Sequence, residues 1–361
     1  MAVAGEAVEV SVAEEDEDRS RLISPAGRPL QTNHVTGRTA MLTEALNRTM
    51  NLPRFCMKVA VLAVFLPLVA CNTSKAPAPT QAGPKTFATP DEAGTALVAA
   101  TRTNDRSALL AIFGSGSTDL IFSGNADQDK QTAANFTNAY QTMHRWRNQP
   151  NGSEVLVVGA DNNPFPIPLA KNSAGQWSFD TAAGKTEILA RRVGDNELAT
   201  IDVMNAMADA QAQYLAQRHN GVKQYAQKFV SDEGQQNGLY WKSAEGKPRS
   251  PLGPLVAFAS TEGFSPQAGK QQPFHGYFYR ILTKQGPDAK GGAKDYIVNG
   301  KMTGGFAFIA YPEKYGDTGI ATFILNQNGI LYDKDLGNST TETATAITEF
   351  NPDKTWTVVP K

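Results

Sequence analysis

The feature that most constrains this chain of 361 residues is a short apolar segment that ends in a cysteine, Met57 to Cys71. Lys58 opens the segment, and the apolar run from Val59 to Val69 is eleven residues long. A helix needs about 20 apolar residues to cross a bilayer, so this run is too short for a span. A cation, a short apolar run and a small residue at the end are typical of a signal peptide, with a buried core helix as the alternative. We therefore expect residues 50–70 to be removed and the remainder to be exported.

Residues 1–49 precede this signal and carry an acidic cluster from Glu14 to Asp18 without apolar periodicity. We expect them to be either untranslated, with the true start at Met50 or Met57, or a disordered leader. Reasoning about the fold therefore excludes them.

The residues that close the segment, Leu68-Val69-Ala70-Cys71, resemble the lipobox of bacterial lipoproteins. The resemblance implies that Cys71 carries lipid and becomes the first residue of the mature protein, so that the first partner is a membrane. In lipoproteins of this kind, Asn72 favours a periplasm-facing position on the outer membrane, with the inner membrane or the cell surface as alternatives. Residues 71–86 are rich in Pro, Ala and Thr, which is typical of a flexible tether.

Charge and cysteine content exclude several classes of protein. Residues 1–71 hold seven basic and eight acidic residues out of totals of 34 and 35, which leaves 27 of each in the rest of the chain. A neutral body lacks the basic surface that nucleic-acid phosphates require. Cys56 lies in the removed segment and Cys71 carries lipid, so the folded part has no thiol for a disulfide or a zinc site.

Residues 87–193 predict a small α+β domain. Thr89 followed by Glu92 has the capping-box pattern of a helix start, and Asp105 can cap a second helix. A third helix is expected from Asp129 to Arg147. Strands are then expected at Glu154–Gly159, Phe165–Leu169 and Gln176–Asp180.

Residues 194–361 predict a second α+β domain, in which one long helix packs on an antiparallel β-meander. The helix is expected to start near Asp195 and to end near Arg218. Its apolar stripe is predicted to be Leu198, Ile201, Met204, Ala208, Ala212 and Leu215. The strands are expected at Gly276–Thr283, Asp295–Val298, Lys301–Tyr311, Gly319–Gln327 and Ile330–Lys334.

Two Asn-Gly pairs, Asn299-Gly300 and Asn328-Gly329, predict two-residue type I′ hairpin turns, because both central residues of that turn have positive φ. The second turn would pair Leu325 with Tyr332. Residues that pair share a face, so this register would leave Asp333 on an exposed face. The opposite face, expected to pack on the long helix, would carry Phe323, Leu325, Ile330 and Tyr332.

Two stretches resemble pilin-like globular domains: NELATIDVMNAMADAQAQYLA (196–216) and GGFAFIAYPEKYGDTGIATFILNQNGILYDKDLG (304–337). The span from Phe87 to the C-terminus also resembles a family of bacterial exported proteins labelled only as a domain of unknown function. That resemblance implies fold and export and supplies no catalytic residues. The motifs that carry it are PFPIPL (164–169), FDTAAGKTEILARRVGDNEL (179–198), GLYW (238–241), SPLGPLVA (250–257), HGYFYRILTKQG (275–286), KDYIVNGKMTGGFA (294–307) and YGDTGIATFILNQNGILYDKDLG (315–337).

The residues suited to chemistry are mainly aromatic. Tyr240, Trp241, His275, Tyr277 and Tyr279 could line a ligand groove, because tyrosine and tryptophan combine apolar area with a polar group, or they could simply pack. No histidine has a metal-ligand partner at helical spacing, and no cofactor motif occurs. The run from Asn125 to Asp129 begins like a calcium loop, but its sixth position is Lys130, so a solvated acidic turn is the better interpretation.

Three hypotheses for function follow from these patterns. The first is a non-enzymatic binding or structural lipoprotein of the cell envelope, whose partner is an envelope protein or a small molecule. The second is a hydrolase-like envelope enzyme that uses Tyr240, Trp241 and His275. The third is a component of a pilus or secretion system. The missing catalytic motifs favour the first hypothesis over the second.

A substitution at the lipobox cysteine tests the predicted anchor. Each acyl methylene buried in a membrane contributes about 0.8 kcal/mol, so two or more chains hold a protein stably. Cys71→Ser should therefore move the protein from the membrane fraction to the soluble or mislocalised fraction, as measured by fractionation and immunoblotting. Cys56→Ser, a cysteine of the removed segment, is the matched control and should leave fractionation unchanged. A Cys71→Ser variant that stays with the membrane like the native chain would disprove the anchor.

Overall fold

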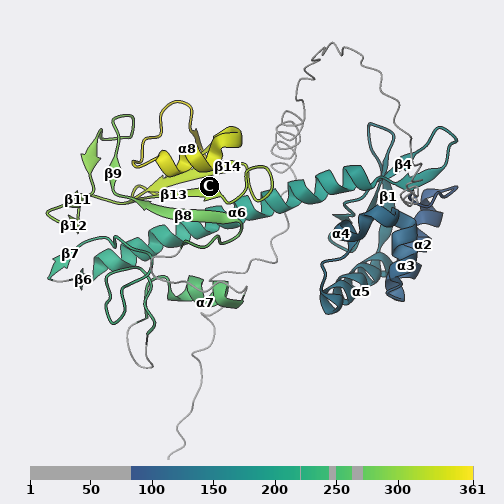
Figure 1. Cartoon of the computed structure of the whole chain (residues 1–361), viewed down its shortest axis with the longest axis horizontal. Helices are drawn as coiled ribbons and strands as arrows, with labels where there is room; N and C mark the ends of the chain where they lie inside the picture. Colours follow the sequence, from purple (N-terminus) through teal and green to yellow (C-terminus); the bar gives the residue numbers. More distant parts are fainter. Residues whose placement is uncertain (1–82, 220, 244–248, 262–270, 361) are drawn as a thin grey trace, which may run out of the picture. The chain divides into compact units, whose positions relative to one another are not determined.

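The computed structural model describes residues 83–360 except for 220, 244–248 and 262–270 (Figure 1). The predicted signal peptide, Cys71 and most of the tether lie outside the described residues. The protein is α+β, as predicted, with helices beside antiparallel sheets. Its buried apolar residues form two clusters within the described part, one between Phe87 and Phe179 and one between Val203 and Val359. None of the helices in that part is long and apolar enough to cross a bilayer.

The first cluster lies between helices and a five-stranded antiparallel sheet with the order β1-β2-β4-β5, in which β3 pairs with β2. The helices are α2 (Pro90–Arg102), α3 (Arg106–Phe113), the 3₁₀ helix η1 (Ser115–Ser117), α4 (Thr118–Ile121) and α5 (Ala126–Thr142). The strands are β1 (His144–Asn148), β2 (Glu154–Val158), β3 (Asn163–Pro164), β4 (Leu169–Lys171) and β5 (Trp177–Phe179).

Side-chain caps fix the helix starts that the sequence predicts. Thr89 Oγ1 accepts a hydrogen bond from the backbone N–H of Glu92 at 3.2 Å, and Asp105 Oδ1 accepts one from Ala108 at 3.0 Å. Such caps satisfy backbone donors that the first helical turn leaves without partners. The capping residues alone were therefore sufficient to predict where α2 and α3 begin.

The predicted third helix starts three residues too late, because α5 begins at Ala126, and it is also wrong at its C-terminal end. Helix α5 ends at Thr142, and residues 144–148 form strand β1 instead. Trp146 pairs with Leu156 of β2, which places the indole beside the apolar cluster. The alternating side chains of a strand leave this tryptophan half-buried while the flanking arginines stay exposed. Pairing with β2 thus outweighs the helical periodicity of the segment.

Helix α6 (Thr181–Ala216) starts earlier than predicted and is continuous over 36 residues. Asp180 Oδ1 caps it by accepting the N–H groups of Ala182 and Ala183 at 3.1 and 3.0 Å. The predicted apolar stripe is also rotated, because Leu198 is 48% exposed. The buried stripe over the second half of the helix includes polar as well as apolar residues: Glu197, Thr200, Val203, Met204, Met207, Ala210, Gln211 and Tyr214.

The second cluster is built around a five-stranded antiparallel sheet with the order β16-β15-β14-β13-β8, the predicted meander. Its strands are β8 (Tyr277–Leu282), β13 (Ala307–Pro312), β14 (Ala321–Asn326), β15 (Leu331–Asp335) and β16 (Thr357–Val358). Shorter strands are β6 (Arg218–His219), β7 (Val222–Lys223), β9 (Lys284–Gln285), β10 (Lys294–Asp295), β11 (Ile297–Val298) and β12 (Lys301–Met302). The other helices are α7 (Gly253–Thr261), η2 (Gly337–Ser339) and α8 (Thr340–Ala346).

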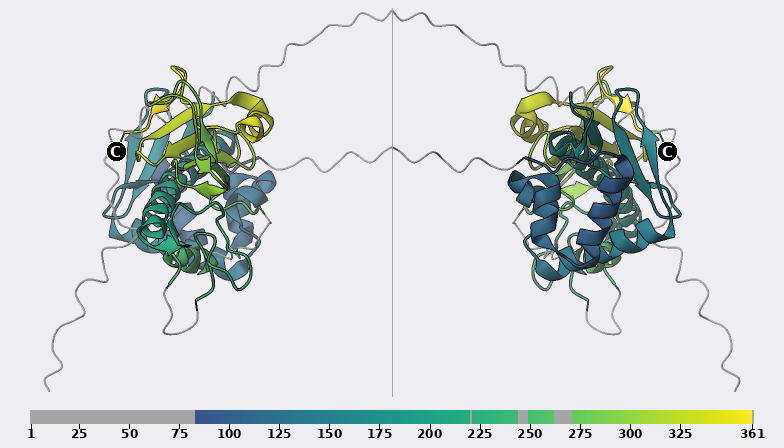
Figure 2. Two further views of the ribbon diagram at one scale, coloured as in Figure 1. Left: turned by 90° about the vertical axis from the view of Figure 1, so that its left-hand side faces the viewer. Right: turned by 90° about the vertical axis from the view of Figure 1, so that its right-hand side faces the viewer.

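Helices cover both faces of this sheet (Figures 1 and 2). The Tyr279 hydroxyl on β8 is hydrogen-bonded to Thr200 of α6 at 3.2 Å. The next residue, Arg280, points to the opposite face and donates to the carbonyls of Ala344 and Ile347, both at 2.7 Å, at the end of α8. All six residues of β14 are buried as a result, so the solvent-exposed sheet face that the sequence predicted is absent from this strand.

The two Asn-Gly turns differ. Asn299 and Gly300 both have positive φ, 50° and 75°, and join Val298 to Lys301 in the predicted type I′ geometry. At the second site only Gly329 has positive φ (66°), and its N–H bonds to Asn326 O. This is the three-residue hairpin loop in which a type I turn is followed by one left-handed residue.

The longer loop shifts the β14–β15 register by one residue from the prediction. Leu325 pairs with Leu331 and Phe323 with Asp333, so Asp333 lies on the α6 face and Tyr332 on the α8 face. The side-chain period of a strand is two, so a shift of one exchanges the faces of the whole partner strand. Phe323 and Leu325 do lie on the α6 face of the sheet. Phe323 is aligned with Tyr279 across strand β13, and Leu325, two residues further along β14, shares that face.

Leu325 is fully buried in this sheet, whereas Ile330 in the same hairpin is 38% exposed. Leu325→Ala should lower the free energy of unfolding by about 2–5 kcal/mol, because it removes buried methyl groups and leaves a cavity. Ile330→Ala is the matched control and should change it by about 0.5 kcal/mol or less. Chemical denaturation of both variants measures the difference. Equal losses would show that the hairpin is not packed as described.

Candidate functional site

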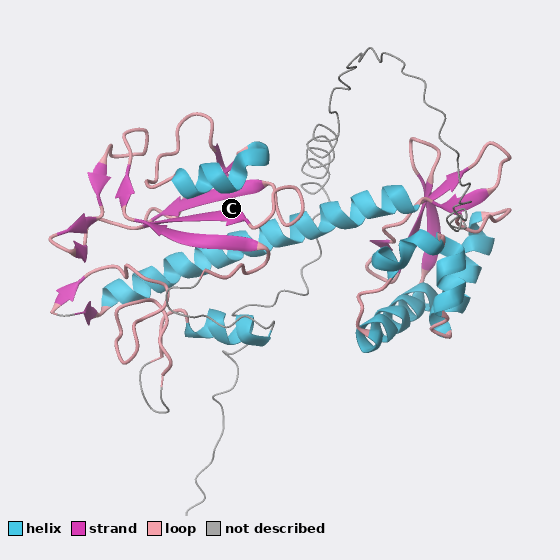
Figure 3. Ribbon diagram, in the orientation of Figure 1, coloured by secondary structure: helices cyan, strands magenta, loops and turns pink. Residues whose placement is uncertain are grey.

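A cavity of about 130 Å³ lies beside helix α6 and is lined by residues of that helix, of strand β8, of α7 and of loops. Figure 3 shows these two helices in cyan and the strand in magenta, in the orientation of Figure 1. Val203 and Met207 line it from α6, one turn apart on the same face. Leu255, Val256 and Ala259 line it from α7, again with helical spacing. Two helical faces therefore form part of the walls, and strand β8 and loop residues form the rest.

A buried glutamine holds the loop that forms the next wall. Gln211 of α6 is fully buried, and its amide donates to Ala226 O at 2.9 Å and accepts from Ala226 N at 2.8 Å. Beyond this point the loop pairs with itself, because Tyr240 N donates to Phe229 O and Ser231 N donates to Tyr240 O. Phe229 and Tyr240 consequently face the cavity from a backbone that is itself hydrogen-bonded.

Tyr279 supplies a deep polar group to the cavity wall. Its hydroxyl lies 3.2 Å from Thr200 Oγ1 and 3.3 Å from the carbonyl oxygen of Phe274. Burial raises the pKa of Tyr279, and the hydrogen bond with Thr200 lowers it by less. This hydroxyl therefore stays protonated and already has partners.

The sequence analysis proposed Tyr240, Trp241, His275 and Tyr277 as ligand-binding residues, and the cavity brings together only part of this set. Tyr240 lines it, whereas Trp241, His275 and Tyr277 are not among its lining residues. The role of these three in ligand binding remains a prediction. Tyr279, which the sequence analysis named with them as a possible groove residue, does line the cavity, and so does Phe274. Helix α7 and its cavity residues were missed.

Tyr277 is fully buried on the α6 face of the sheet and is not among the residues that line the cavity. Its hydroxyl donates to Ala321 O at 2.9 Å, and a Cβ atom at Gly319 would collide with its ring. Burial raises the pKa of Tyr277, and the negative charge of Glu197 raises it further. This tyrosine thus packs α6 against the start of β14.

His275 occupies a tight turn before β8. His275 and Gly276 have φ of 48° and 71°, and Phe274 and Tyr277 on either side exchange backbone hydrogen bonds at 2.9 and 3.1 Å. Two central residues with positive φ define a type I′ turn. Histidine is one of the few side chains enriched in this left-handed region. Backbone geometry therefore explains a histidine at this position.

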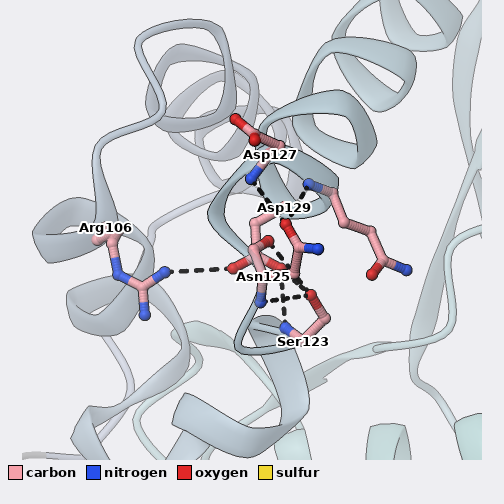
Figure 4. A network of polar contacts seen from close by, with 6 residues as sticks. Arg106, Ser123, Asn125, Asp127 and Asp129 are labelled. Carbon is pink, nitrogen blue, oxygen red and sulfur yellow. Dashed lines mark hydrogen bonds and ion pairs between the residues drawn. The ribbon is translucent and has the colours of Figure 1, made fainter.

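The acidic run in the first cluster forms a helix cap (Figure 4). Asn125 Oδ1 accepts the N–H groups of Asp127 and Gln128 at the start of α5, at 3.1 and 3.2 Å. Asp129 accepts two hydrogen bonds from Ser123, at 2.8 and 2.7 Å, and lies 3.3 Å from the Arg106 guanidinium. The oxygens are occupied by protein donors, and the described residues contain no group of His, Cys, Asp and Glu arranged to hold a metal ion.

Substitutions at His275 separate a conformational role from a chemical one. His275→Val should lower the free energy of unfolding by about 1–2 kcal/mol more than His275→Asn, because a β-branched residue is strained at positive φ and asparagine is not. Chemical denaturation of the two variants gives this difference. Any hydrolytic activity of the native chain that His275→Asn abolishes, with folding intact, would restore the enzyme hypothesis.

Asp129 makes stability depend on pH. Hydrogen bonds from the backbone and hydroxyl of Ser123, then the Arg106 contact, hold the pKa of Asp129 below its usual 3.8. A lowered folded-state pKa contributes stability above the unfolded value, and this contribution is lost as the pH falls through the folded value. Asp129→Asn should therefore reduce the loss of unfolding free energy between about pH 6 and about pH 3. Asp127→Asn, a carboxylate of the same turn with no side-chain partner among the described residues, is the control. If both variants keep the native pH dependence, the cap is not coupled to protonation.

The chain matches a known protein family, and the match is to that family alone. No curated protein and no solved structure matches the chain, so the likeness to pilin-like domains stays a prediction. Residues 84–359 match the family described as "Protein of unknown function (DUF2950)", which is more than half of the chain. This extent includes the cavity, the five-stranded sheets and every motif for which the family resemblance was expected. The chain therefore belongs to the DUF2950 family.

Proposed function

We propose that this chain is a cell-envelope lipoprotein whose folded body binds a small molecule without transforming it. The observation that carries the proposal is the cavity beside α6, which is lined mainly by apolar side chains and has few hydrogen-bonding groups. Pockets of this composition are typical binding sites for small molecules. Its position between α6, α7 and β8 gives it walls from three separate elements.

The location is proposed from the N-terminal sequence. The signal-peptide pattern of residues 50–70 and the lipobox at Cys71 support export and a lipid anchor. Asn72 supports the outer membrane, on the periplasmic side, with the inner membrane or the cell surface as alternatives. The tether of residues 71–86 would then hold the binding body away from the membrane.

The cavity supports binding over catalysis. The enzyme hypothesis requires Tyr240, Trp241 and His275 to act at one place, and only Tyr240 lines the cavity. The nearby hydroxyl of Tyr279 has a raised pKa, so it is a poor base at neutral pH. A general base must lie within hydrogen-bond reach of the reacting group and must have a pKa near the working pH. The arrangement of Tyr240 and Tyr279 favours neither condition.

Methionine NMR provides a direct test of binding. Met207 lines the cavity, whereas Met302 is fully buried in the same apolar cluster but does not line it. The full chain, with labelled methionine methyl groups, would be titrated with toluene, methylcyclohexane, benzoate, octanoate and glucose. At least one compound should shift the Met207 methyl resonance saturably and leave that of Met302 in place. If none does, the proposed binding role is wrong.

A further inference from the structure

The volume of the cavity limits its occupant to about one ring. An engineered cavity of about 150 Å³ lined by apolar residues binds benzene, and the cavity beside α6 measures about 130 Å³. A single six-membered ring therefore fits, whereas a bicyclic compound or a long acyl chain would extend beyond the walls. Size alone does not distinguish an aromatic from an aliphatic ring.

The uncharged walls, as far as the structure describes them, disfavour ionised ligands. No Asp, Glu, Lys, Arg or His side chain lines the cavity in the described part of the chain. A charged group that enters an apolar site loses its hydration and needs an opposite charge in return. Amino acids, carboxylates and phosphate esters would therefore be disfavoured.

The hydrogen-bonding groups of the walls exclude ligands with many hydroxyls. The Tyr279 hydroxyl already contacts Thr200 and Phe274, and Gln271 is exposed and donates to the Tyr311 hydroxyl at 3.3 Å. Tyr240 and Gln272 are the lining residues that remain to bond a ligand. A sugar would bury several hydroxyls without partners, which is unfavourable, whereas one hydroxyl is tolerated.

The side chains of the walls favour an aromatic ring. Phe229, Tyr240, Phe274 and Tyr279 line the cavity together with Met207, which carries a thioether sulfur. Aromatic pairs gain energy from edge-to-face or offset contacts, and sulfur also contacts ring edges favourably. A saturated ring of the same size makes neither interaction. We infer that the cavity binds one uncharged aromatic ring, free or as the terminal group of a larger molecule.

This inference rests on the proposed binding function and is tested by the order of affinities in the same full chain. Toluene should bind with the highest affinity, as measured by the saturation of the Met207 methyl shift. Methylcyclohexane should bind about two- to tenfold more weakly, because it lacks the ring contacts. Benzoate should bind at least about a hundredfold more weakly, because its charge would be buried without a partner, and glucose should give no shift.

Variants that fill the cavity check the place of binding. Val256→Phe on α7 and Val203→Phe on α6 should each weaken toluene binding at least about tenfold, because each fills the cavity from a different wall. Val298→Phe is the matched control, since Val298 is 48% exposed on β11 and does not line the cavity. The comparison among ligands uses the native chain, so it decides the inference even if a filling variant does not fold.

The outcomes separate the two proposals. Benzoate, octanoate, methylcyclohexane or glucose binding as tightly as toluene would overturn the aromatic inference and leave the binding function standing. Toluene binding that neither folded filling variant weakens would also overturn it. Absence of any Met207 shift, with every compound, removes the binding function itself.

Discussion

The buried carboxylate of Glu197 is the interaction on which the C-terminal part of the fold depends. This side chain is 8% exposed, and Oε1 accepts the backbone N–H groups of Ile320 and Ala321 at 3.0 and 2.9 Å. Burying a carboxylate costs several kcal/mol unless hydrogen bonds replace its water. The two N–H groups are available only where β14 begins, so the carboxylate stabilises one axial and rotational position of α6 on the sheet. Asn196 supports the same position by donating to Thr318 O at 2.9 Å.

The cavity follows from that position. Once Glu197 is fixed, helical spacing brings Thr200 to Tyr279, then Met207 to the cavity and Gln211 to Ala226. Each of the polar residues in this stripe has a specific partner, whereas Met207 is buried in the apolar cluster and lines the cavity. A stripe made wholly of leucine would pack in several rotations with similar energy. The polar residues thus select a single packing, and that packing leaves room beside Met207.

The fold class and the starts of α2 and α3 could be predicted from sequence because they depend on local chemistry. The caps at Thr89 and Asp105 and the turn at Asn299-Gly300 each use interactions within a few residues. The errors arose where distant partners decide. Leu198 is exposed because Glu197 and Thr200 find partners far away in sequence. The register of the hairpin at Asn328-Gly329 was predicted wrongly because both faces of β14 are buried, so apolar patterning could not select between registers.

The candidate site was only half predictable for the same reason. Tyr240 was proposed from its aromatic character alone, and it lines the cavity because a backbone pairing with Phe229 turns it inward. His275 was considered for its ring nitrogens, yet its left-handed φ of 48° gives a conformational reason for its presence. Catalysis requires groups that stabilise developing charge, and walls made of aliphatic and aromatic side chains offer little of this. The same walls make burial of an uncharged ring favourable, because apolar area leaves water without any polar group losing a partner. The composition that argues against chemistry at this site is therefore also what favours binding there.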